Sequence, residues 1–155
     1  MIIGICLGII ATIFFGDLWI KNQVERKGVE GNTRKVWNGR LLIRKHHNKG
    51  IALNIGQKRQ PIVALVSLIF TVLMLCLLVV SLGMKGNNLL RIGLAFIVGG
   101  GFSNTYDRLK RKYVVDYFSF GTNWSPLRSI VFNMSDFCIM IGALLAVIGS
   151  GKPSN

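Results

Sequence analysis

The sequence predicts an all-α membrane protein with four transmembrane helices in a single domain. Hydrophobic residues make up 51% of the 155 residues, and the mean hydropathy is +0.49. Four apolar segments each approach the ~20 residues that cross a bilayer as a helix. Nineteen Lys and Arg against six Asp and Glu give a net charge of +13. Such a charge suits nucleic acid or an anionic membrane surface, and the apolar segments favour the membrane.

The four helices are expected in regular order along the chain. The first covers 1–20, which lacks the basic start and small-residue cleavage site of a removable signal peptide. The second covers 61–83 and opens with Pro61, a residue suited to the first helical turn. The third covers about 88–107 and the fourth 129–150.

The connections between these helices differ in length and character. A basic stretch, 21–60, follows the first helix and contains short β-like runs broken by Asn-Gly and Lys-Gly. A short link joins the second and third helices, and the basic, aromatic segment 108–128 joins the third and fourth. With four spans, the segments 21–60 and 108–128 lie on the same membrane face. Polar side chains distant in sequence should therefore gather there: Asp17, Asn48, Asn104, Asp107, Asp116, Asn133 and Asp136.

Two carboxylates of this group suggest chemistry. If the last helix begins near Arg128, Asp136 lies about 12 Å inside it and shares a helix face with Asn133. A carboxylate in hydrocarbon costs roughly 2.5–3.5 kcal/mol, so a function is expected for it. Asp116 lies in the apolar, aromatic segment "KYVVDYF". Two neighbouring carboxylates in a poorly hydrated site share a proton, as in aspartic proteases.

Structural interpretations compete with this one. Polar groups between membrane helices commonly hold the helices together. Asp107 next to Arg108 is typical of a structural ion pair, and Asp17 near the interface is typical of a capping residue. The glycines 99–101 allow another backbone to approach closely. We expect no metal and no cofactor, because the cysteines and histidines do not have ligand spacing.

Four short motifs resemble those of the lipoprotein signal peptidases, or signal peptidase II. "SNTYDRLKRKYVVDYF" is similar to the family block G-N-x-x-D-R, seven residues, V-D-F, and "FNMSD" resembles F-N-x-A-D. "HNKGIAL" is similar to N-x-G-A-A-F, and "GDLWIKNQV" to D-Q-x-x-K. The resemblance covers nearly the whole chain. The chain departs from the family pattern at Leu18, Ser103 and Ser135, and "GIALNI" replaces G-A-A-F.

The resemblance implies an intramembrane aspartic endopeptidase with Asp116 and Asp136 as the catalytic dyad. Residues that bind substrate or support the site would be Asn48, Asn104, Arg108, Asn133, Asp107 and Asp17. The segment 21–60 would form a small extracytoplasmic β-cradle. The substrate would be a prolipoprotein, cut before its diacylglyceryl-modified cysteine, and globomycin would inhibit the reaction. The resemblance implies a multi-pass protein of the bacterial cytoplasmic membrane with an extracytoplasmic active site, and we expect a monomer.

The distribution of basic residues keeps other functions open. The segments 21–60 and 108–128 carry 16 of the 19 Lys and Arg, whereas the positive-inside rule predicts basic loops on the cytoplasmic side. That charge also suits a non-catalytic membrane protein that binds anionic lipids or signal peptides. A small transporter is a further alternative, although no discontinuous-helix repeat is visible. Nucleic-acid binding is disfavoured, because the basic residues share their segments with membrane anchors.

Overall fold

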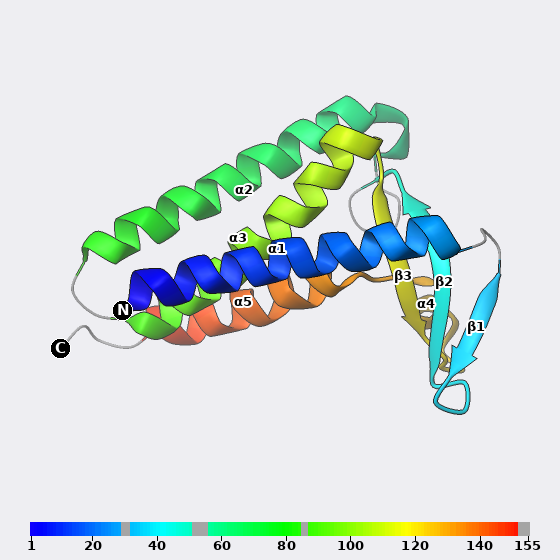
Figure 1. Cartoon of the computed structure of the whole chain (residues 1–155). Helices are drawn as coiled ribbons and strands as arrows, with labels where there is room; N and C mark the ends of the chain where they lie inside the picture. Colours follow the sequence, from blue (N-terminus) through cyan, green and yellow to red (C-terminus); the bar gives the residue numbers. More distant parts are fainter. Residues whose placement is uncertain (29–31, 51–55, 85–86, 152–155) are drawn as a thin grey trace.

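A bundle of four long helices carries a small sheet at one end (Figure 1). The computed structural model describes residues 1–28, 32–50, 56–84 and 87–151. The elements in chain order are α1 (Ile2–Lys27), β1 (Thr33–Val36), β2 (Leu41–Asn48), the 3-10 turn η2 (Gln57–Arg59), α2 (Gln60–Gly83), α3 (Asn88–Arg111), β3 (Val114–Phe120), the short helix α4 (Ser125–Ser129) and α5 (Met134–Ser150).

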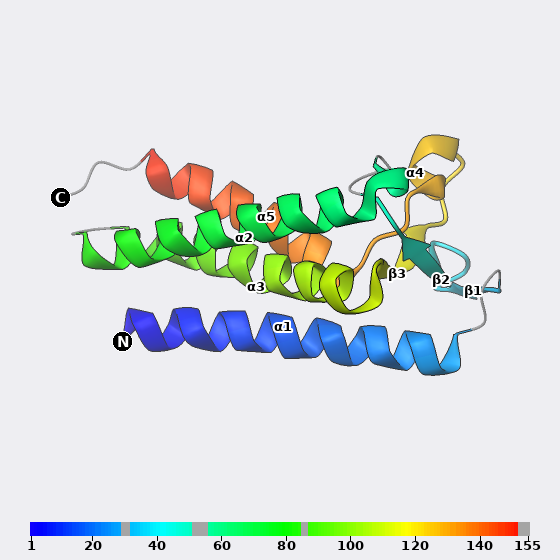
Figure 2. The ribbon, with the colours of Figure 1, turned by 90° about the horizontal axis from the view of Figure 1, so that it is seen from above.

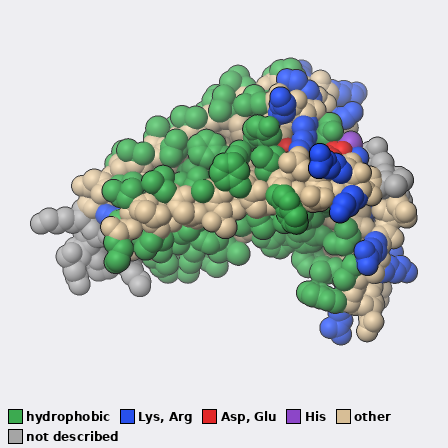
Figure 3. All heavy atoms as spheres, viewed as in Figure 1, with side chains coloured by type: hydrophobic (Ala, Val, Ile, Leu, Met, Phe, Trp, Pro, Cys, Tyr) green, Lys and Arg blue, Asp and Glu red, His purple; other side chains and the backbone are tan. Residues whose placement is uncertain are grey.

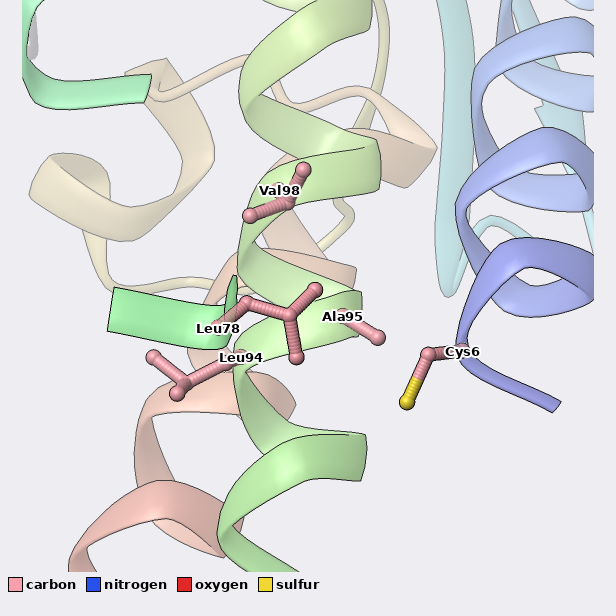
Figure 4. Packing of buried hydrophobic residues seen from close by; sticks show 5 residues of the cluster. All are labelled: Cys6, Leu78, Leu94, Ala95 and Val98. Carbon is pink, nitrogen blue, oxygen red and sulfur yellow. The ribbon is translucent and has the colours of Figure 1, made fainter. Parts of the chain in front are cut away.

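Helix α3 is the central helix of the bundle and packs against α1, α2 and α5 (Figure 2). A small apolar core joins three of these helices (Figure 4). It comprises Cys6 of α1, Leu78 of α2, and Leu94, Ala95 and Val98 of α3.

The glycines at 99–101 explain how α3 can contact three helices at once. An added Cβ would lie 3.2 Å from the backbone of Ile10 in α1 at Gly99, and 2.7 Å from the Ser135 carbonyl oxygen of α5 at Gly100. At Gly101 it would lie 2.8 Å from the Thr71 hydroxyl of α2. Successive helical residues point about 100° apart. Three consecutive glycines therefore permit close approach on three sides. The sequence predicted such an approach by one other backbone.

The sheet draws on two distant segments of the chain. Strands β1, β2 and β3 are antiparallel in the order β1-β2-β3. The sequence placed β-like structure only in 21–60, but the third strand comes from 108–128 and lies beside β2. Its residues are buried on both faces for most of its length, so its sequence is mostly apolar, interrupted by Asp116 and Ser119, and does not alternate regularly.

Helix boundaries differ from those expected. Helices α1 and α3 continue beyond residues 20 and 107, to Lys27 and Arg111. The last helix begins at Met134 rather than 129, because 125–129 form α4 and Phe132 pairs with Phe118 in an extended segment. Asp136 is consequently in the first turn of α5 and not about 12 Å inside a helix. The carboxylate therefore caps a helix end, where it is favourable.

Two helices, Ile2–Lys27 and Gln57–Gly83, are long and apolar enough to cross a membrane, and α5 is an apolar helix of 17 residues. Large hydrophobic side chains cover the outside of the bundle, whereas Lys and Arg gather at the sheet end (Figure 3). A hydrophobic surface of this extent is what a lipid-facing bundle presents. The four-span arrangement itself stays a prediction.

Replacing Gly100 with alanine should disturb the start of α5. The new Cβ would meet the Ser135 carbonyl oxygen at 2.7 Å, and overpacking of this kind costs about 1–3 kcal/mol. We expect Gly100→Ala to lower the apparent melting temperature in detergent, measured by circular dichroism. Gly8→Ala is the matched control, because nothing lies within 4 Å of its added Cβ. Equal melting temperatures for the two variants would contradict the close α3–α5 contact.

Candidate active site

Asp116 lies in the middle of β3 with both carboxylate oxygens occupied. The side-chain amide of Asn48, at the end of β2, donates to Oδ2 at 3.0 Å. The side-chain amide of Asn133 donates to Oδ1 at 2.7 Å. Asp116 is almost fully buried, so these two donors replace the water that a carboxylate would otherwise bind.

Asp136 is held at the N-terminus of α5 by a capping box. Its Oδ2 accepts from the Asn133 backbone N–H at 3.0 Å, while the Asn133 side-chain oxygen accepts from the Asp136 backbone N–H at 3.0 Å. This reciprocal pair satisfies two donors of the first helical turn. Asn133 and Asp136 are therefore related as helix cap and third helical residue, and not as neighbours on one helix face.

Asn133 thus links the two carboxylates directly. It binds Asp116 through its side chain and Asp136 through its backbone. Both aspartates line a pocket of about 500 Å³ between α2, α3, β3 and α5. Phe70 and Met140 also line it and are 45% and 60% exposed, so the pocket reaches the apolar outer surface of the bundle.

Asn104 binds the second carboxylate oxygen of Asp136. Its orientation is set by Lys21, a residue to which the sequence alone assigned no role. The Asn104 side-chain N–H donates to Asp136 Oδ1 at 3.0 Å, and its oxygen accepts from Lys21 Nζ at 2.8 Å. The ammonium group can only donate, so it fixes which end of the amide faces Asp136. Lys21 is the last residue of "GDLWIK". Its match to the lysine of D-Q-x-x-K was the signal in the sequence that could have identified it.

Lys21 is the centre of a buried polar network behind the pocket. Its Nζ lies 2.8 Å from Asp17 and 3.3 Å from Asp107, and it donates to the Ser103 hydroxyl at 3.0 Å. All four of these side chains are fully buried. A buried charge needs this degree of pairing and hydrogen bonding.

Asp17 lies inside this network rather than at a helix cap or the interface. Its Oδ2 accepts from the hydroxyls of Ser103 at 2.7 Å and Ser135 at 2.5 Å. Its Oδ1 accepts from the Tyr117 hydroxyl at 3.0 Å. Asp17 joins α1 to α3, β3 and α5, and it does not contact Asp116 or Asp136 among the hydrogen bonds of the described residues.

The predicted ion pair between Asp107 and Arg108 is wrong. Asp107 is paired with Lys21 and with Arg111, each at 3.3 Å, and it accepts from the Val115 backbone N–H. Adjacent helical residues do not face each other. Arg108 instead lines the pocket and donates to the Gly50 carbonyl at 3.1 Å.

Arg108 is held in place by several hydrogen bonds. Two of its guanidinium nitrogens donate to the Gly50 and Asn104 carbonyls and to the Ser67 hydroxyl. Its Nε is buried without a hydrogen-bond partner among the described residues. Residues 51–55, which include the end of the "HNKGIAL" motif, and residues 85–86 of the second link lie outside the described part of the chain.

Burial is the main influence on the pKa of Asp116. Desolvation and the nearby charge of Asp136 raise this pKa to about 7, although hydrogen bonds from Asn133 and Asn48 act in the opposite direction. At neutral pH the Asp116 carboxyl is therefore partly protonated. Within the described residues, no cluster of three His, Cys, Asp or Glu is arranged to hold a metal ion.

A family model described as signal peptidase (SPase) II matches residues 9–151 of this chain. The chain belongs to the signal peptidase II family. The motif resemblance in the sequence is thereby confirmed, and the family is one of proteases that process lipoproteins in the membrane.

Relatives named lipoprotein signal peptidase support the family assignment. The Fusobacterium nucleatum protein is 32% identical over 132 residues, which is 85% of this chain and 77% of that protein. The Caldicellulosiruptor bescii protein is 30% identical over 138 residues, 88% and 84% of the two chains. The Shewanella amazonensis protein is 37% identical, but the match covers 51% of this chain and only 47% of that protein.

A solved bacterial membrane enzyme has the same fold. It superposes with a TM-score of 0.80 at 22% identity and covers 99% of this chain and 94% of that one. Two of the positions at which this chain departs from the family motif, Ser103 and Ser135, both donate to Asp17. In this chain the departures therefore strengthen the network behind the pocket.

Removing the buried ammonium should destabilise the protein strongly. Lys21→Met leaves Asp17 without its cation and frees the Asn104 amide to rotate. Loss of one partner of a buried ion pair costs about 3–5 kcal/mol, so we expect a large fall in the apparent melting temperature. Adding Asp17→Asn should recover part of that fall, because the uncompensated charge is removed.

The control for this experiment is Lys110→Met, which removes an exposed lysine of α3. It should leave the melting temperature unchanged. If Lys21→Met matched this control, the network would not stabilise the fold.

Proposed function

We propose that this chain is an aspartic endopeptidase that removes the signal peptide from diacylglyceryl-modified prolipoproteins, cutting before the lipidated cysteine. One observation carries the proposal. Two buried carboxylates, from β3 and α5, are linked by Asn133 and line one pocket. The pocket reaches the apolar outer surface, where a lipid-modified substrate would approach from the membrane.

The proposed reaction uses one shared proton. The ionised carboxylate takes a proton from a water molecule, and the resulting hydroxide attacks the scissile carbonyl carbon. The protonated carboxyl donates a hydrogen bond to the carbonyl oxygen and then helps to protonate the leaving amine. The pKa of Asp116, raised to about 7, supports a pair that retains one proton at neutral pH.

The remaining predicted site residues have positioning roles in this proposal. Asn48, Asn104 and Asn133 hold the carboxylate oxygens in place through the hydrogen bonds described above. Arg108 lines the pocket, and its guanidinium is suited to donate to a substrate backbone carbonyl. Asp17 and Asp107 support the site from behind, through Lys21.

The proposal includes the placement of the chain in the membrane. All four long helices would cross the bacterial cytoplasmic membrane, with the sheet and the dyad on the extracytoplasmic side. The protein would act as a monomer without a metal or cofactor, and globomycin would occupy the pocket. The positive-inside rule favours the opposite orientation, because the outer segments are basic. A protease added outside the cell should cut the 21–60 segment in the proposed orientation and not in the opposite one.

Cleavage of a diacylglyceryl-modified prolipoprotein by the purified protein in detergent tests the dyad. We expect Asp116→Asn and Asp136→Asn each to reduce the cleavage rate by at least a thousandfold, because neither amide can exchange the required proton. Both variants should keep the melting temperature within a few degrees of the wild type, since asparagine is nearly isosteric. Globomycin should inhibit the wild-type protein.

Glu25→Gln is the matched control, since it neutralises an acid of α1 that contacts Lys45 and His47 and does not line the pocket. Wild-type rates in either dyad variant would overturn the catalytic assignment. A folded wild type that binds lipid or signal peptide without cleaving would favour the non-catalytic alternative.

The pH dependence of kcat/KM tests the shared proton separately. We expect the rate to fall as pH rises through the pKa of Asp116, about 7, because the pair then loses its last proton. Asn48 donates to the ionised form of Asp116, so Asn48→Ala should raise this pKa. The alkaline limb of the profile should move to higher pH. An unmoved limb, or one moved to lower pH, would contradict the assignment.

A further inference from the structure

A second hollow of the molecule lies outside the active-site pocket. It is a groove of about 840 Å³ between the C-terminal turns of α1 and strands β1 and β2. It shares no lining residue with the pocket that holds the two aspartates. Its size is within the range of small-molecule and cofactor sites, and the reaction proposed above does not use it.

One wall of the groove is apolar. Trp19, Ile20 and Val24 of α1 line it, together with Ile43 of β2. Trp19 is 64% exposed and Ile43 is 37% exposed. Contiguous exposed apolar side chains mark surfaces that contact a membrane or another apolar partner.

The other wall is cationic. Lys27, Arg34, Arg44 and Lys45 line it, and no acidic side chain does so among the described residues. Lys45 is engaged by Glu25 at 2.7 Å. Arg44 is held by the Arg128 carbonyl at 2.7 Å, and its Nε has no hydrogen-bond partner among the described residues. Lys27 and Arg34 are exposed.

The length of α1 places this groove at the level of lipid headgroups. The helix has 26 residues, about 39 Å at 1.5 Å per residue, whereas the hydrocarbon core is about 30 Å thick. If α1 crosses the membrane, its last turns must leave the hydrocarbon. Trp19 lies near this boundary, which is where tryptophan is enriched in membrane proteins.

We propose that this groove binds an anionic phospholipid. The phosphate would contact the exposed cations Lys27 and Arg34. An acyl chain would lie along Trp19 and Ile20. A basic rim above an apolar wall complements both the charge and the amphipathic shape of such a lipid. The site does not depend on the proposed cleavage reaction.

Trp19 provides a direct probe of this groove. The chain has three tryptophans, so Trp37→Phe/Trp124→Phe leaves Trp19 as the single emitter. The full chain in detergent micelles would be titrated with phosphatidylglycerol or phosphatidylcholine that carries brominated acyl chains. We expect half-maximal quenching at about a tenfold lower mole fraction of phosphatidylglycerol, as one or two lipid-proximal cations would provide.

Charge variants in the same tryptophan background test whether Lys27 and Arg34 cause the preference for phosphatidylglycerol. Lys27→Gln/Arg34→Gln should reduce the tenfold preference to about twofold or less. Lys58→Gln/Arg59→Gln is the matched control: it removes two exposed cations at the sheet end of the bundle that do not line the groove. The control should keep the tenfold preference, and both variants should keep the parent melting temperature.

Three outcomes would overturn the proposal. Equal quenching by the two lipids would mean that the groove is ordinary lipid-facing surface. A preference that survives Lys27→Gln/Arg34→Gln would place the anionic headgroup elsewhere. If both charge variants lost the same part of the preference for phosphatidylglycerol, the preference would come from the net charge of the sheet end and not from the groove. Each result is independent of whether the protein cleaves prolipoproteins.

Discussion

The structure depends on the burial of a single ammonium group. Lys21 has no access to water, so every donor of its Nζ must find an oxygen inside the protein. Asp17 comes from the same helix, whereas Ser103, Asn104 and Asp107 come from α3. Asp17 then binds Tyr117 of β3 and Ser135 of α5. Three helices and the sheet are thereby fixed relative to one another by hydrogen bonds with little tolerance for displacement.

This arrangement explains how a site can be rigid although its carboxylates lie on different elements. Asp116 belongs to a strand and Asp136 to a helix terminus, and Asn133 binds both. Asn104 reaches Asp136 from α3, and the orientation of its amide is set by Lys21. The three glycines of α3 permit the close helix contacts on which these distances depend. Packing and hydrogen bonding therefore support the same geometry.

The sequence located elements whose apolar length or motifs identify them. It did not locate features that depend on contacts between distant segments. Apolar length located the four long helices. The motif resemblance paired Asp116 with Asp136, and both line one pocket. The start of α5 was misplaced because the apolar character of 129–133 continues that of the helix, although Phe132 pairs with a strand. The third strand was missed because β3 is buried on both faces and has no alternation. Asp107 was paired with its neighbour in sequence, whereas its partners are one helical turn away and on another helix.

Two groups among the basic residues of the outer segments have different consequences. Lys21, Arg44, Lys45, Arg108 and Arg111 contact acceptors of the protein, and their charge is used within the fold. Lys27 and Arg34 are exposed at the sheet end and line the groove described above. Exposed cations interact with a phosphate layer when they lie within about a Debye length of it. Their field attracts anionic headgroups on whichever side of the membrane that end lies. The charge that disagrees with the positive-inside rule is therefore suited to lipid contact, and this suitability does not depend on orientation.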